Sequence, residues 1–336
     1  MRSAVLSGLG ACLPARTVKS SEIEKEFNVR QGWITSRTGI ELRHFISPGE
    51  ATGDLAVRAG ERALAHSGVH RADALVLATS TPDQLCPPTA PQVAAALGLG
   101  HVAAFDVAAV CSGFVYALVT AAGLIATSVA DRVLVIGADT FSTIVDPNDL
   151  ATRAVFGDGA GAAVLRAGRA DEPGALSGMR LSSDGTGHGL ITIQGGGSRA
   201  RSTSLPVGSQ DMFLTMAGQA TFTEAVRRMS ESVMRTAADC SWTADDIDRI
   251  VLHQANARIL AAVARRLELP SERFVSNIAQ VGNTAAASIP LALATAAATG
   301  ELTAGHRVVL GSFGGGLTWG SAALVWPQLN KEVPHP

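Results

Sequence analysis

The chain of 336 residues is 47% hydrophobic and 17% charged, so it can bury one large core or two smaller ones and is not expected to be disordered. A formal net charge of −2 and a pI near 6.4 argue against a nucleic-acid-binding protein, which needs a concentrated excess of Lys and Arg. The four cysteines show no zinc-ligand spacing and no apolar run is long enough to span a membrane. We therefore expect a cytoplasmic protein with no metal site and no membrane partner.

The first predicted element is residues 4–12, an apolar run that ends in Leu-Gly-Ala-Cys and superficially resembles a secretory or lipoprotein signal. Only Arg2 supplies a basic residue before it, and the run is at the short limit for such a signal. We interpret it as a buried first strand.

Short apolar, β-branched runs then alternate along the chain with Ala-rich stretches of helical character. Alternation of this kind predicts an α/β protein in which a largely parallel sheet is covered by helices. The runs that we expect to form strands are residues 74–78, 104–107, 133–136, 250–252, 274–277 and 308–310.

The strand expected at 104–107 leads to Cys111, at the start of a helical pattern. A thiol at a helix N-terminus lies near unpaired N–H groups and the positive end of the helix dipole, both of which favour thiolate and would make Cys111 a nucleophile. The alternative is a small cysteine buried in the core, which is the commoner fate of a lone Cys.

Residues 157–161, Gly-Asp-Gly-Ala-Gly, could suggest a dinucleotide-binding loop. The spacing does not fit GxGxxG, and the apolar run 162–165 follows in place of a helix. We expect a close-packed turn.

Two further polar residues follow expected strands. His253 comes directly after 250–252, and the ends of strands in α/β sheets commonly hold functional groups. Asn283 follows 274–277 and begins the next small-residue helix, in the position of the second half that we take as equivalent to Cys111. Each residue alone has a structural alternative, a packed histidine or a helix N-cap.

The chain repeats itself once. Residues 73–77 and 131–135 correspond to 248–252 and 305–309 at an offset of roughly 175 residues, and the glycine-rich segments 157–164 and 314–325 follow in the same order. No Pro-, Ser- or charge-rich linker separates the two parts. We predict two related, tightly packed halves, residues 1–175 with the cysteine and residues 176–336 with the histidine and asparagine, whose loops converge on one site.

Taken together, these motifs resemble those of the β-ketoacyl-acyl carrier protein synthase III family of thiolase-superfamily condensing enzymes. The resemblance covers nearly the whole chain, including residues 33–40, 157–165 and 317–320. It implies a thiolase-like fold of two βαβαβαββ halves packed as a five-layered αβαβα sandwich. The motifs that carry it are Cys111-Ser112-Gly113-Phe114, His253-Gln254-Ala255-Asn256, Gly282-Asn283-Thr284 and Phe313-Gly314-Gly315-Gly316.

The resemblance implies a two-step reaction. Cys111 would take an acyl group from acyl-CoA, with the N–H groups of Cys111 and Gly315 as the oxyanion hole, and malonyl-acyl carrier protein would then lose carbon dioxide and attack the acyl group. His253 and Asn283 would donate hydrogen bonds to the enolate. Coenzyme A thioester is a substrate here, and no permanently bound cofactor is implied. Classical thiolase activity is disfavoured because residues 311–316 contain no second cysteine.

Substrate-binding residues follow from the same resemblance. Trp33 and Arg37 match positions that bind the adenine end of CoA, and Phe222, Ala255 and Asn256 match the pantetheine tunnel. The family commonly has an arginine within residues 146–150, where this chain has Leu150. Whether Arg153 substitutes for it, and whether CoA or a carrier protein is the acyl donor, stays open.

The acyl pocket is implied to include Cys86, Leu214 and Met216. Family members often have a phenylalanine at the position of Cys86 that plugs the pocket of the neighbouring subunit in a homodimer, so the smaller side chain predicts a primer longer or bulkier than acetyl. The alternative is that Cys86 only packs at a dimer contact.

The helix after His253 is implied to bind the acidic carrier protein. Its basic residues are Arg258, Arg265 and Arg266, and two of them are seven positions apart, which places them on nearly the same face. The alternative for these residues is an ordinary solvated face.

Two other functions remain alternatives. One is an acyltransferase that passes an acyl group from Cys111 to an oxygen, nitrogen or sulfur acceptor in specialised metabolism. The other is an inactive subunit that shapes a complex. Retention of Asn283 favours condensation, since simple acyl transfer needs no enolate stabilisation.

Overall fold

The computed structural model describes residues 2–203 and 208–329, and its first sheet has the strand order β1-β7-β6-β4-β5. Strand β4 runs parallel to β5 and β6, whereas β7 is antiparallel to both β1 and β6. The sheet is therefore mixed, and the expectation of a largely parallel sheet is wrong for β1 and β7. The strands are β1 (Ser3–Cys12), β4 (Ala74–Ala78), β5 (Ala103–Val107), β6 (Arg132–Thr140) and β7 (Asp158–Gly168).

The second sheet repeats this arrangement. Its order is β11-β12-β13-β8, with β11 and β12 parallel and the other pairs antiparallel, so its strands correspond to β4, β6, β7 and β1 of the first sheet. The division expected between residues 175 and 176 falls just ahead of β8 and stays a prediction. The strands are β8 (Ser177–Ser183), β11 (Arg249–Leu252), β12 (Arg307–Gly314) and β13 (Thr318–Val325).

The counterpart of β5, expected at 274–277, is not a regular strand. Only a single bridge joins Ile250 to Phe274, directly after the 3₁₀ turn η5 (Ser271–Arg273). The side chain of Gln254 donates to the carbonyl oxygens of Leu252 and Val275 and accepts from Asn277 N. A side chain thus supplies hydrogen bonds that a longer strand ladder would otherwise make.

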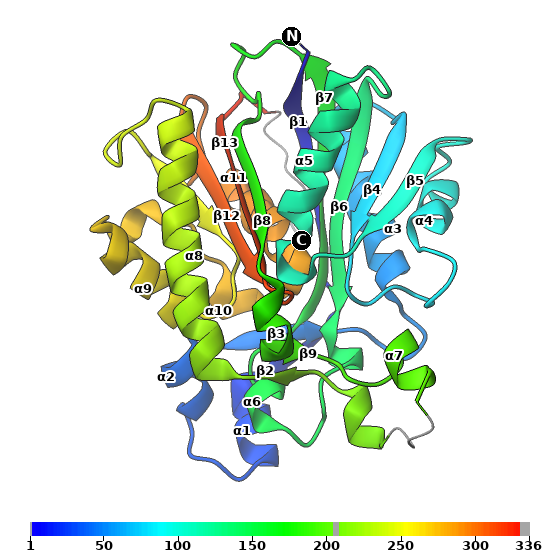
Figure 1. Ribbon diagram of the computed structural model, residues 1–336, viewed down its shortest axis with the longest axis vertical. Helices are drawn as coiled ribbons and strands as arrows, with labels where there is room; N and C mark the ends of the chain where they lie inside the picture. Colours follow the sequence, from blue (N-terminus) through cyan, green and yellow to red (C-terminus); the bar gives the residue numbers. More distant parts are fainter. Residues whose placement is uncertain (1, 204–207, 330–336) are drawn as a thin grey trace.

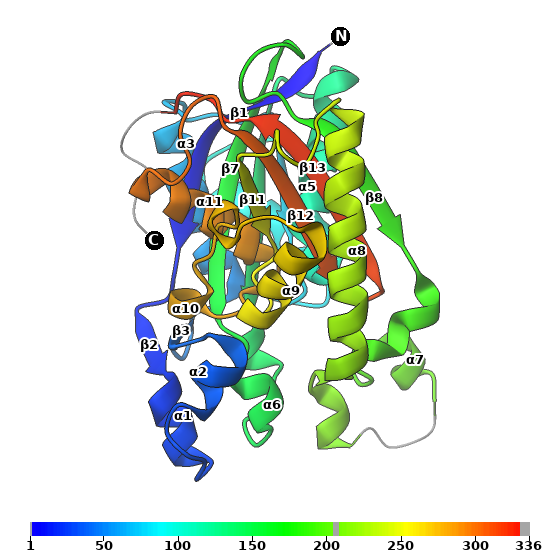
Figure 2. The same cartoon turned by 90° about the vertical axis from the view of Figure 1, so that its left-hand side faces the viewer.

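Helices complete five layers in the order αβαβα (Figures 1 and 2). Helix α3 (Thr52–His66) and α4 (Ala90–Ala96) cover the outer face of the first sheet, and α8 (Gly218–Asp239) and α9 (Ala257–Leu267) cover that of the second. Helices α5 (Gly113–Ala126) and α11 (Ser288–Thr299) lie between the sheets. Because α5 and α11 are covered on both sides, they are apolar nearly all round.

Glycines allow the central helices to approach the first sheet closely. A Cβ at Gly161 of β7 would lie 2.7 Å from Pro290 Cβ of α11, and one at Gly137 of β6 would lie 2.3 Å from Ala286 O. Residues 158–161 of the Gly-rich segment 157–161, which we expected to form a turn, are part of strand β7. Its glycines serve helix packing, and the segment is not a phosphate-binding loop.

The shorter elements gather at one end of the two sheets, the lower end in Figure 1. The shorter elements are β2 (Arg16–Lys19), α1 (Ser20–Glu26), α2 (Trp33–Thr38), β3 (Leu42–Phe45), η2 (Phe141–Thr143), α6 (Leu150–Arg153), η3 (Gly185–Leu190), β9 (Ile191–Thr192), α7 (Ser198–Arg201), η4 (Ser209–Met212), β10 (Thr215–Met216) and α10 (Ile278–Val281).

Among the described residues no helix is long and apolar enough to cross a membrane.

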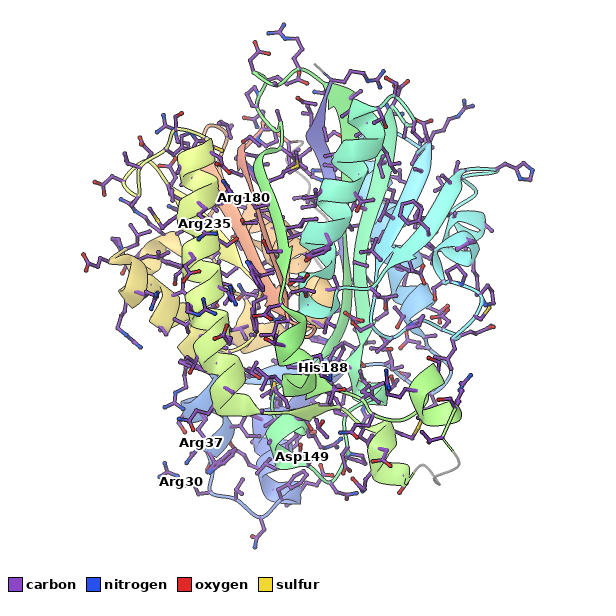
Figure 3. The ribbon with its side chains drawn as sticks, in the orientation of Figure 1. Arg30, Arg37, Asp149, Arg180, His188 and Arg235 are labelled. Atoms are coloured by element: carbon purple, nitrogen blue, oxygen red, sulfur yellow. The ribbon has the colours of Figure 1, made fainter. Side chains whose placement is uncertain are left out.

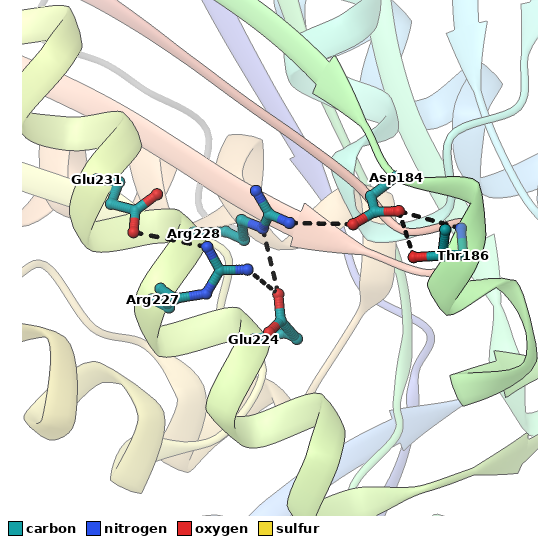
Figure 4. A network of polar contacts seen from close by, with 6 residues as sticks. All are labelled: Asp184, Thr186, Glu224, Arg227, Arg228 and Glu231. Atoms are coloured by element: carbon teal, nitrogen blue, oxygen red, sulfur yellow. Dashed lines mark hydrogen bonds and ion pairs between the residues drawn. The ribbon is translucent and has the colours of Figure 1, made fainter.

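A polar network joins α8 to the loop after β8 (Figure 4). Arg228 pairs with Glu224 on its own helix and with Asp184, at 3.2 and 3.1 Å. The backbone of Asp184 in turn exchanges two 2.9 Å hydrogen bonds with Leu317. Residue 317 follows the glycine-rich turn after β12, so this network ties α8 to that turn.

Candidate active site

Cys111 lies in the 3₁₀ turn η1 (Val110–Ser112), between β5 and the start of α5. The preceding Val110 has φ of +47°, a left-handed conformation that β-branched residues rarely adopt. The side chain of Ser112 is fully buried and donates to Thr318 O at 2.9 Å. The thiol is thus held on a constrained turn, at the helix start that the sequence predicts.

The thiol is not activated in the way that its helix position suggested. Burial raises the pKa of Cys111 well above its ordinary value, and the negative charge of Asp139 raises it further. The hydrogen bond from its own backbone N–H acts in the opposite direction but is the smallest of the three effects. Cys111 is therefore a thiol in the ligand-free protein, because desolvation outweighs the N–H groups of the helix terminus.

His253 follows β11 and is 2% exposed. Its backbone N–H donates to Gly311 O at 2.8 Å, and its ring Nδ1 lies 2.6 Å from Ser288 Oγ at the start of α11. Burial lowers the pKa of His253 from 6.5 to about 3. The ring is therefore a neutral imidazole at physiological pH, able to carry one N–H donor.

Asn283 lies just before the 3₁₀ turn η6 (Ala285–Ala287). Its Oδ1 accepts from Ala285 N at 2.9 Å, while its backbone N–H and C=O bond to Val155 and Gly157. Within residues 2–203 and 208–329 no hydrogen bond to the side-chain NH₂ group is found. The amide is thus oriented by its oxygen and keeps its donors available.

These three residues line one cavity of about 160 Å³. Most of its wall is apolar, so charge that develops inside it is poorly screened by water. The cavity also includes Met216, Phe222, Ala255 and Asn256, four of the residues expected to bind substrate. The remaining lining residues are Val110, Phe141, Val155, Phe156, Ile191, Gly218, Thr221, Ala225, Met229, Ile259, Phe313 and Gly314.

The glycine-rich turn after β12 meets the cysteine turn. A Cβ at Gly314 would lie 2.8 Å from Cys111 N, so only glycine permits this approach. Gly314 lines the cavity, whereas Gly315, the residue expected to share the oxyanion hole, is buried beside it against Ile191.

The turns next to Cys111 and Asn283 are related by the internal repeat, but in a different register from the one expected. Turns η1 and η6 both begin with a residue at φ +47°, Val110 and Ala285, and each leads into a central helix. Cys111 therefore corresponds to Ala286, and Asn283 lies three residues earlier. The expected equivalence of Cys111 and Asn283 is wrong, because the two halves share the backbone turn but place these side chains at different positions relative to it.

Asn256 lines the cavity and also caps a helix. Its Oδ1 accepts from Arg258 N at 2.8 Å and so caps the N-terminus of α9. Leu214 lies behind the cavity wall, in a buried cluster with Cys111, Phe141 and Phe156. Cys86 is exposed on the loop after β4 and does not line the cavity within one chain.

Trp33 and Arg37 lie on α2 outside the cavity. The Arg37 guanidinium carbon is 4.3 Å from the centre of the Trp33 ring, and Figure 3 shows Arg37 at the lower end of the molecule. Gly39, which ends α2, packs against Ala257 at the start of α9, where a Cβ would lie 2.4 Å from that of Ala257. Helix α2 is thus fixed beside the residues that begin α9.

Arg153, the possible substitute for the missing arginine at position 150, forms an ion pair with Glu26. Its Nη2 lies 3.1 Å from Glu26 Oε2, and its guanidinium lies over the Phe45 ring. Leu150 packs on the apolar cluster that also includes Trp33.

The basic residues Arg258, Arg265 and Arg266 are exposed on α9, and none of them forms an ion pair with any residue that the structure describes.

Two residues of the site were missed from the sequence. Ser288 contacts the histidine ring, and Asp139 lies close enough to Cys111 to raise its pKa. Ser288 follows Asn283 by five residues, with the 3₁₀ turn η6 between them, so no regular helical spacing in the sequence marks it. No sequence signal marks Asp139, which lies inside an apolar strand.

Comparison with known proteins agrees with this geometry. Models described as 3-oxoacyl-acyl-carrier-protein (ACP) synthase III match residues 105–185 and, for the C-terminal part, residues 237–326. A protein of Streptomyces coelicolor named beta-ketoacyl-acyl-carrier-protein synthase III 3 is 53% identical over 98% of this chain and 99% of its own length. The chain belongs to the 3-oxoacyl-ACP synthase III family. A synthase III of Pseudomonas aeruginosa is 51% identical over 98% of both chains.

Solved structures of similar proteins share the fold. The crystal structure of the Pseudomonas aeruginosa PAO1 enzyme has a TM-score of 0.91, with 49% identity over 98% of this chain and 99% of that one. The priming β-ketosynthase of the R1128 polyketide biosynthetic pathway has a TM-score of 0.89 at 31% identity, over 97% of each chain. The thiolase-like fold and the acyltransferase class expected from the sequence are thereby confirmed.

Proposed function

We propose that this chain is a decarboxylative condensing enzyme that makes a 3-oxoacyl thioester, with Cys111, His253 and Asn283 as its catalytic residues. The observation that carries the proposal is that these three side chains, from distant parts of the chain, line one apolar cavity. A nucleophile and two neutral hydrogen-bond donors are what acyl transfer followed by enolate formation requires.

The first half-reaction loads the primer. Cys111 Sγ attacks the carbonyl carbon of acyl-CoA, the bond from that carbon to the CoA sulfur breaks, and the departing CoA sulfur takes up the proton that Cys111 loses. The backbone N–H groups of Cys111 and Gly315 stabilise the oxyanion. Because Cys111 is buried and protonated before substrate binds, its proton must leave during this step.

The second half-reaction breaks the bond between the malonyl methylene carbon and its carboxylate. Carbon dioxide leaves, and the enolate oxygen accepts hydrogen bonds from His253 and Asn283. The methylene carbon then attacks the acyl group, the carbon–sulfur bond to Cys111 breaks, and the Cys111 thiolate takes up a proton from solvent. A neutral imidazole suits this donor role, since Ser288 Oγ can donate to Nδ1 and leave the proton of the ring on Nε2.

We also propose how the substrates reach the cavity. Trp33 and Arg37 would hold the nucleotide end of CoA, while Phe222, Ala255 and Asn256 line the path of the pantetheine arm. The exposed arginines of α9, which lie beyond Asn256, would bind the acidic carrier protein that brings the malonyl group. No cofactor would be bound permanently.

We infer a homodimer and a primer longer than acetyl. In the described part of the chain β5 pairs only with β4, so its other edge is free to pair with another chain. Leu85, next to Cys86, is 74% exposed, which is unusual for a large apolar side chain unless a partner covers it. The small Cys86 side chain would then leave room in the partner's acyl pocket.

The test is to incubate the protein with acetyl-, hexanoyl-, octanoyl- and aromatic acyl-CoA and then with malonyl-ACP. We expect a single acyl adduct by intact mass spectrometry, greater with octanoyl than acetyl, followed by carbon dioxide release and a 3-oxoacyl-ACP product. C111A should form no adduct, whereas C240S, which changes a cysteine that does not line the cavity, should react normally. An adduct that passes only to a non-malonyl acceptor would favour the acyltransferase alternative, and strict acetyl preference would contradict the primer proposal.

A further inference from the structure

Asp139 is a fully buried carboxylate that the reaction above does not use. It lies near the end of β6, and one oxygen, Oδ1, accepts from Ser80 N at 2.7 Å and from the hydroxyls of Thr79 and Thr81, both at 3.2 Å. The other oxygen, Oδ2, accepts from Ala286 N at 2.9 Å. Asp139 therefore joins a turn of the N-terminal half to a turn of the C-terminal half.

The turn that Asp139 holds is the turn that orients Asn283. Ala285 N donates to Asn283 Oδ1, and the next N–H along the chain, that of Ala286, donates to Asp139 Oδ2. Ala285 has φ of +47°, which L-residues rarely adopt. Two successive N–H groups of one strained turn are thus fixed by a catalytic amide on one side and by a buried carboxylate on the other.

The carboxylate is itself held rigidly from the side of the N-terminal half. Thr81 Oγ1, which donates to Asp139, also accepts from Thr140 N at 2.8 Å and lies 3.0 Å from Thr52 Oγ1. These threonines are all buried. A carboxylate that accepts hydrogen bonds from four donors has little freedom to move, so it can hold the facing η6 turn in one position.

We propose that Asp139 is a positioning residue that sets the Asn283 amide for decarboxylation of the malonyl thioester, a role that rests on the function proposed above. It acts through the η6 turn and does not itself touch substrate. Loading of Cys111 depends on the η1 turn and the glycine-rich turn, so it does not need this link.

The substitution D139N tests the proposal, because an asparagine can keep only part of the network. If its oxygen faces Ser80, Thr79 and Thr81, its NH₂ group is opposite Ala286 N, and two donors then meet. The charge of Asp139, which raises the pKa of Cys111, is lost at the same time. D139N should therefore loosen the η6 turn that orients the Asn283 amide, without raising the pKa of the Cys111 thiol.

A matched control is D158N. Asp158 is also fully buried and accepts from Ser142 N, Ser142 Oγ and Ile46 N, but all of these bonds lie within the N-terminal half. Both variants would be assayed for the rate of octanoyl loading on Cys111 and, separately, for carbon dioxide release from malonyl-ACP. Rates would be normalised to the fraction of protein that can be acylated, so that misfolded molecules do not count.

For D139N we expect carbon dioxide release to fall by about tenfold to a hundredfold, the effect of misplacing a donor by a fraction of an ångström, with loading within about threefold of wild type. D158N should change both steps by the same factor or neither. T81V, which removes one hydroxyl from Asp139 and keeps the charge, should give a smaller loss in the same direction. Equal losses in both steps for D139N, or a selective loss in D158N, would overturn the proposal. A wild-type protein that loads Cys111 but never decarboxylates malonyl-ACP would instead refute the proposed function.

Discussion

The orientation of His253 depends on one hydroxyl group. The ring is neutral because it is buried, and a neutral imidazole can present either nitrogen as its donor. Ser288 Oγ, 2.6 Å from Nδ1, is the one side chain found to hydrogen-bond this ring among the described residues. The proton position that the proposed reaction needs is therefore set by a residue outside the recognised motifs.

Replacing Ser288 tests this dependence. In S288A the Nδ1 atom loses its partner, so we expect carbon dioxide release from malonyl-ACP to fall by about tenfold or more, as for loss of a partner that orients a catalytic histidine. S288T keeps the hydroxyl and should restore most of the rate. The measurement is the rate of decarboxylation by acylated enzyme as a function of pH. A role in packing alone would lower stability equally in both variants and leave the rate per folded molecule unchanged.

For individual residues, the sequence predicts which side chains meet but not their protonation states. Cys111, His253 and Asn283 stand out because each follows an expected strand and lies in a specific motif. Their pKa values could not be predicted, because burial, which is the largest effect on both Cys111 and His253, depends on the assembled halves. The helix-terminus argument for Cys111 considered only local structure and therefore gave the wrong direction for its pKa.

Among the elements, α2 shows how a short helix can be fixed without a strong helix-forming sequence. It has six residues, and its N-terminal N–H groups are bound by Glu24 of α1, which accepts from Gly32 N at 2.9 Å and from Ile34 N at 2.8 Å. Glu24 is itself buried. The position of Trp33 and Arg37, and with it the proposed CoA clamp, therefore depends on one carboxylate.

We expect E24Q to raise the KM for acyl-CoA by about fivefold to tenfold, which corresponds to one lost hydrogen bond, with little change in kcat. The KM for an acyl-pantetheine donor, which has no nucleotide, should not change. E22Q is the matched control, since Glu22 lies on the same helix and, in the part of the chain that the structure describes, its side chain accepts a hydrogen bond only from Lys19 N at the start of α1. A parallel rise in both KM values would show that E24Q disturbs the whole mouth of the cavity and not the clamp.

Apolar runs in the sequence predicted β1, β4, β6, β11 and β12 well, because buried strands are apolar whatever their neighbours. The partly exposed edge strand β5 was also predicted. Two predictions failed for a tertiary reason. The segment 274–277 forms a single bridge because the Gln254 side chain takes over its hydrogen bonding, and the glycines of β7 pack against α11 where a turn was expected. Neither contact can be predicted from the neighbouring residues in the sequence.

For the molecule as a whole, the internal repeat was the most informative feature of the sequence. It predicted two related halves whose loops converge on one site, and the structure has two sheets with matching strand order. It failed by three residues at the site itself, because Cys111 and Asn283 perform different tasks and the repeat preserves the backbone turn but not the position of the reacting side chain. The carboxylate that links the two turns, Asp139, corresponds to no motif.

Burial of ionisable groups also gives the molecule a pH-dependent stability. His253 has a pKa of about 3 in the folded protein and 6.5 ordinarily, so the unfolded chain binds more protons between these values and stability rises with pH across this window. Asp139 and Asp158 have pKa values raised by burial to about 7 and about 6, so the folded protein binds more protons above pH 3.8 and stability falls as pH rises through those values. The two trends oppose each other in the wild type.

The variant H253Q isolates the first trend. The difference in free energy of unfolding between wild type and H253Q should grow with pH from about 4 to 6.5, with a slope near 1.4 kcal/mol per pH unit, and become constant above pH 6.5. Denaturant titrations at half-unit steps of pH would measure it. H101Q, which changes an exposed histidine, should give a curve parallel to that of the wild type. A constant difference for H253Q across the same range would mean that the imidazole is not kept neutral by the folded protein, and the donor role proposed for it would then lose its physical basis.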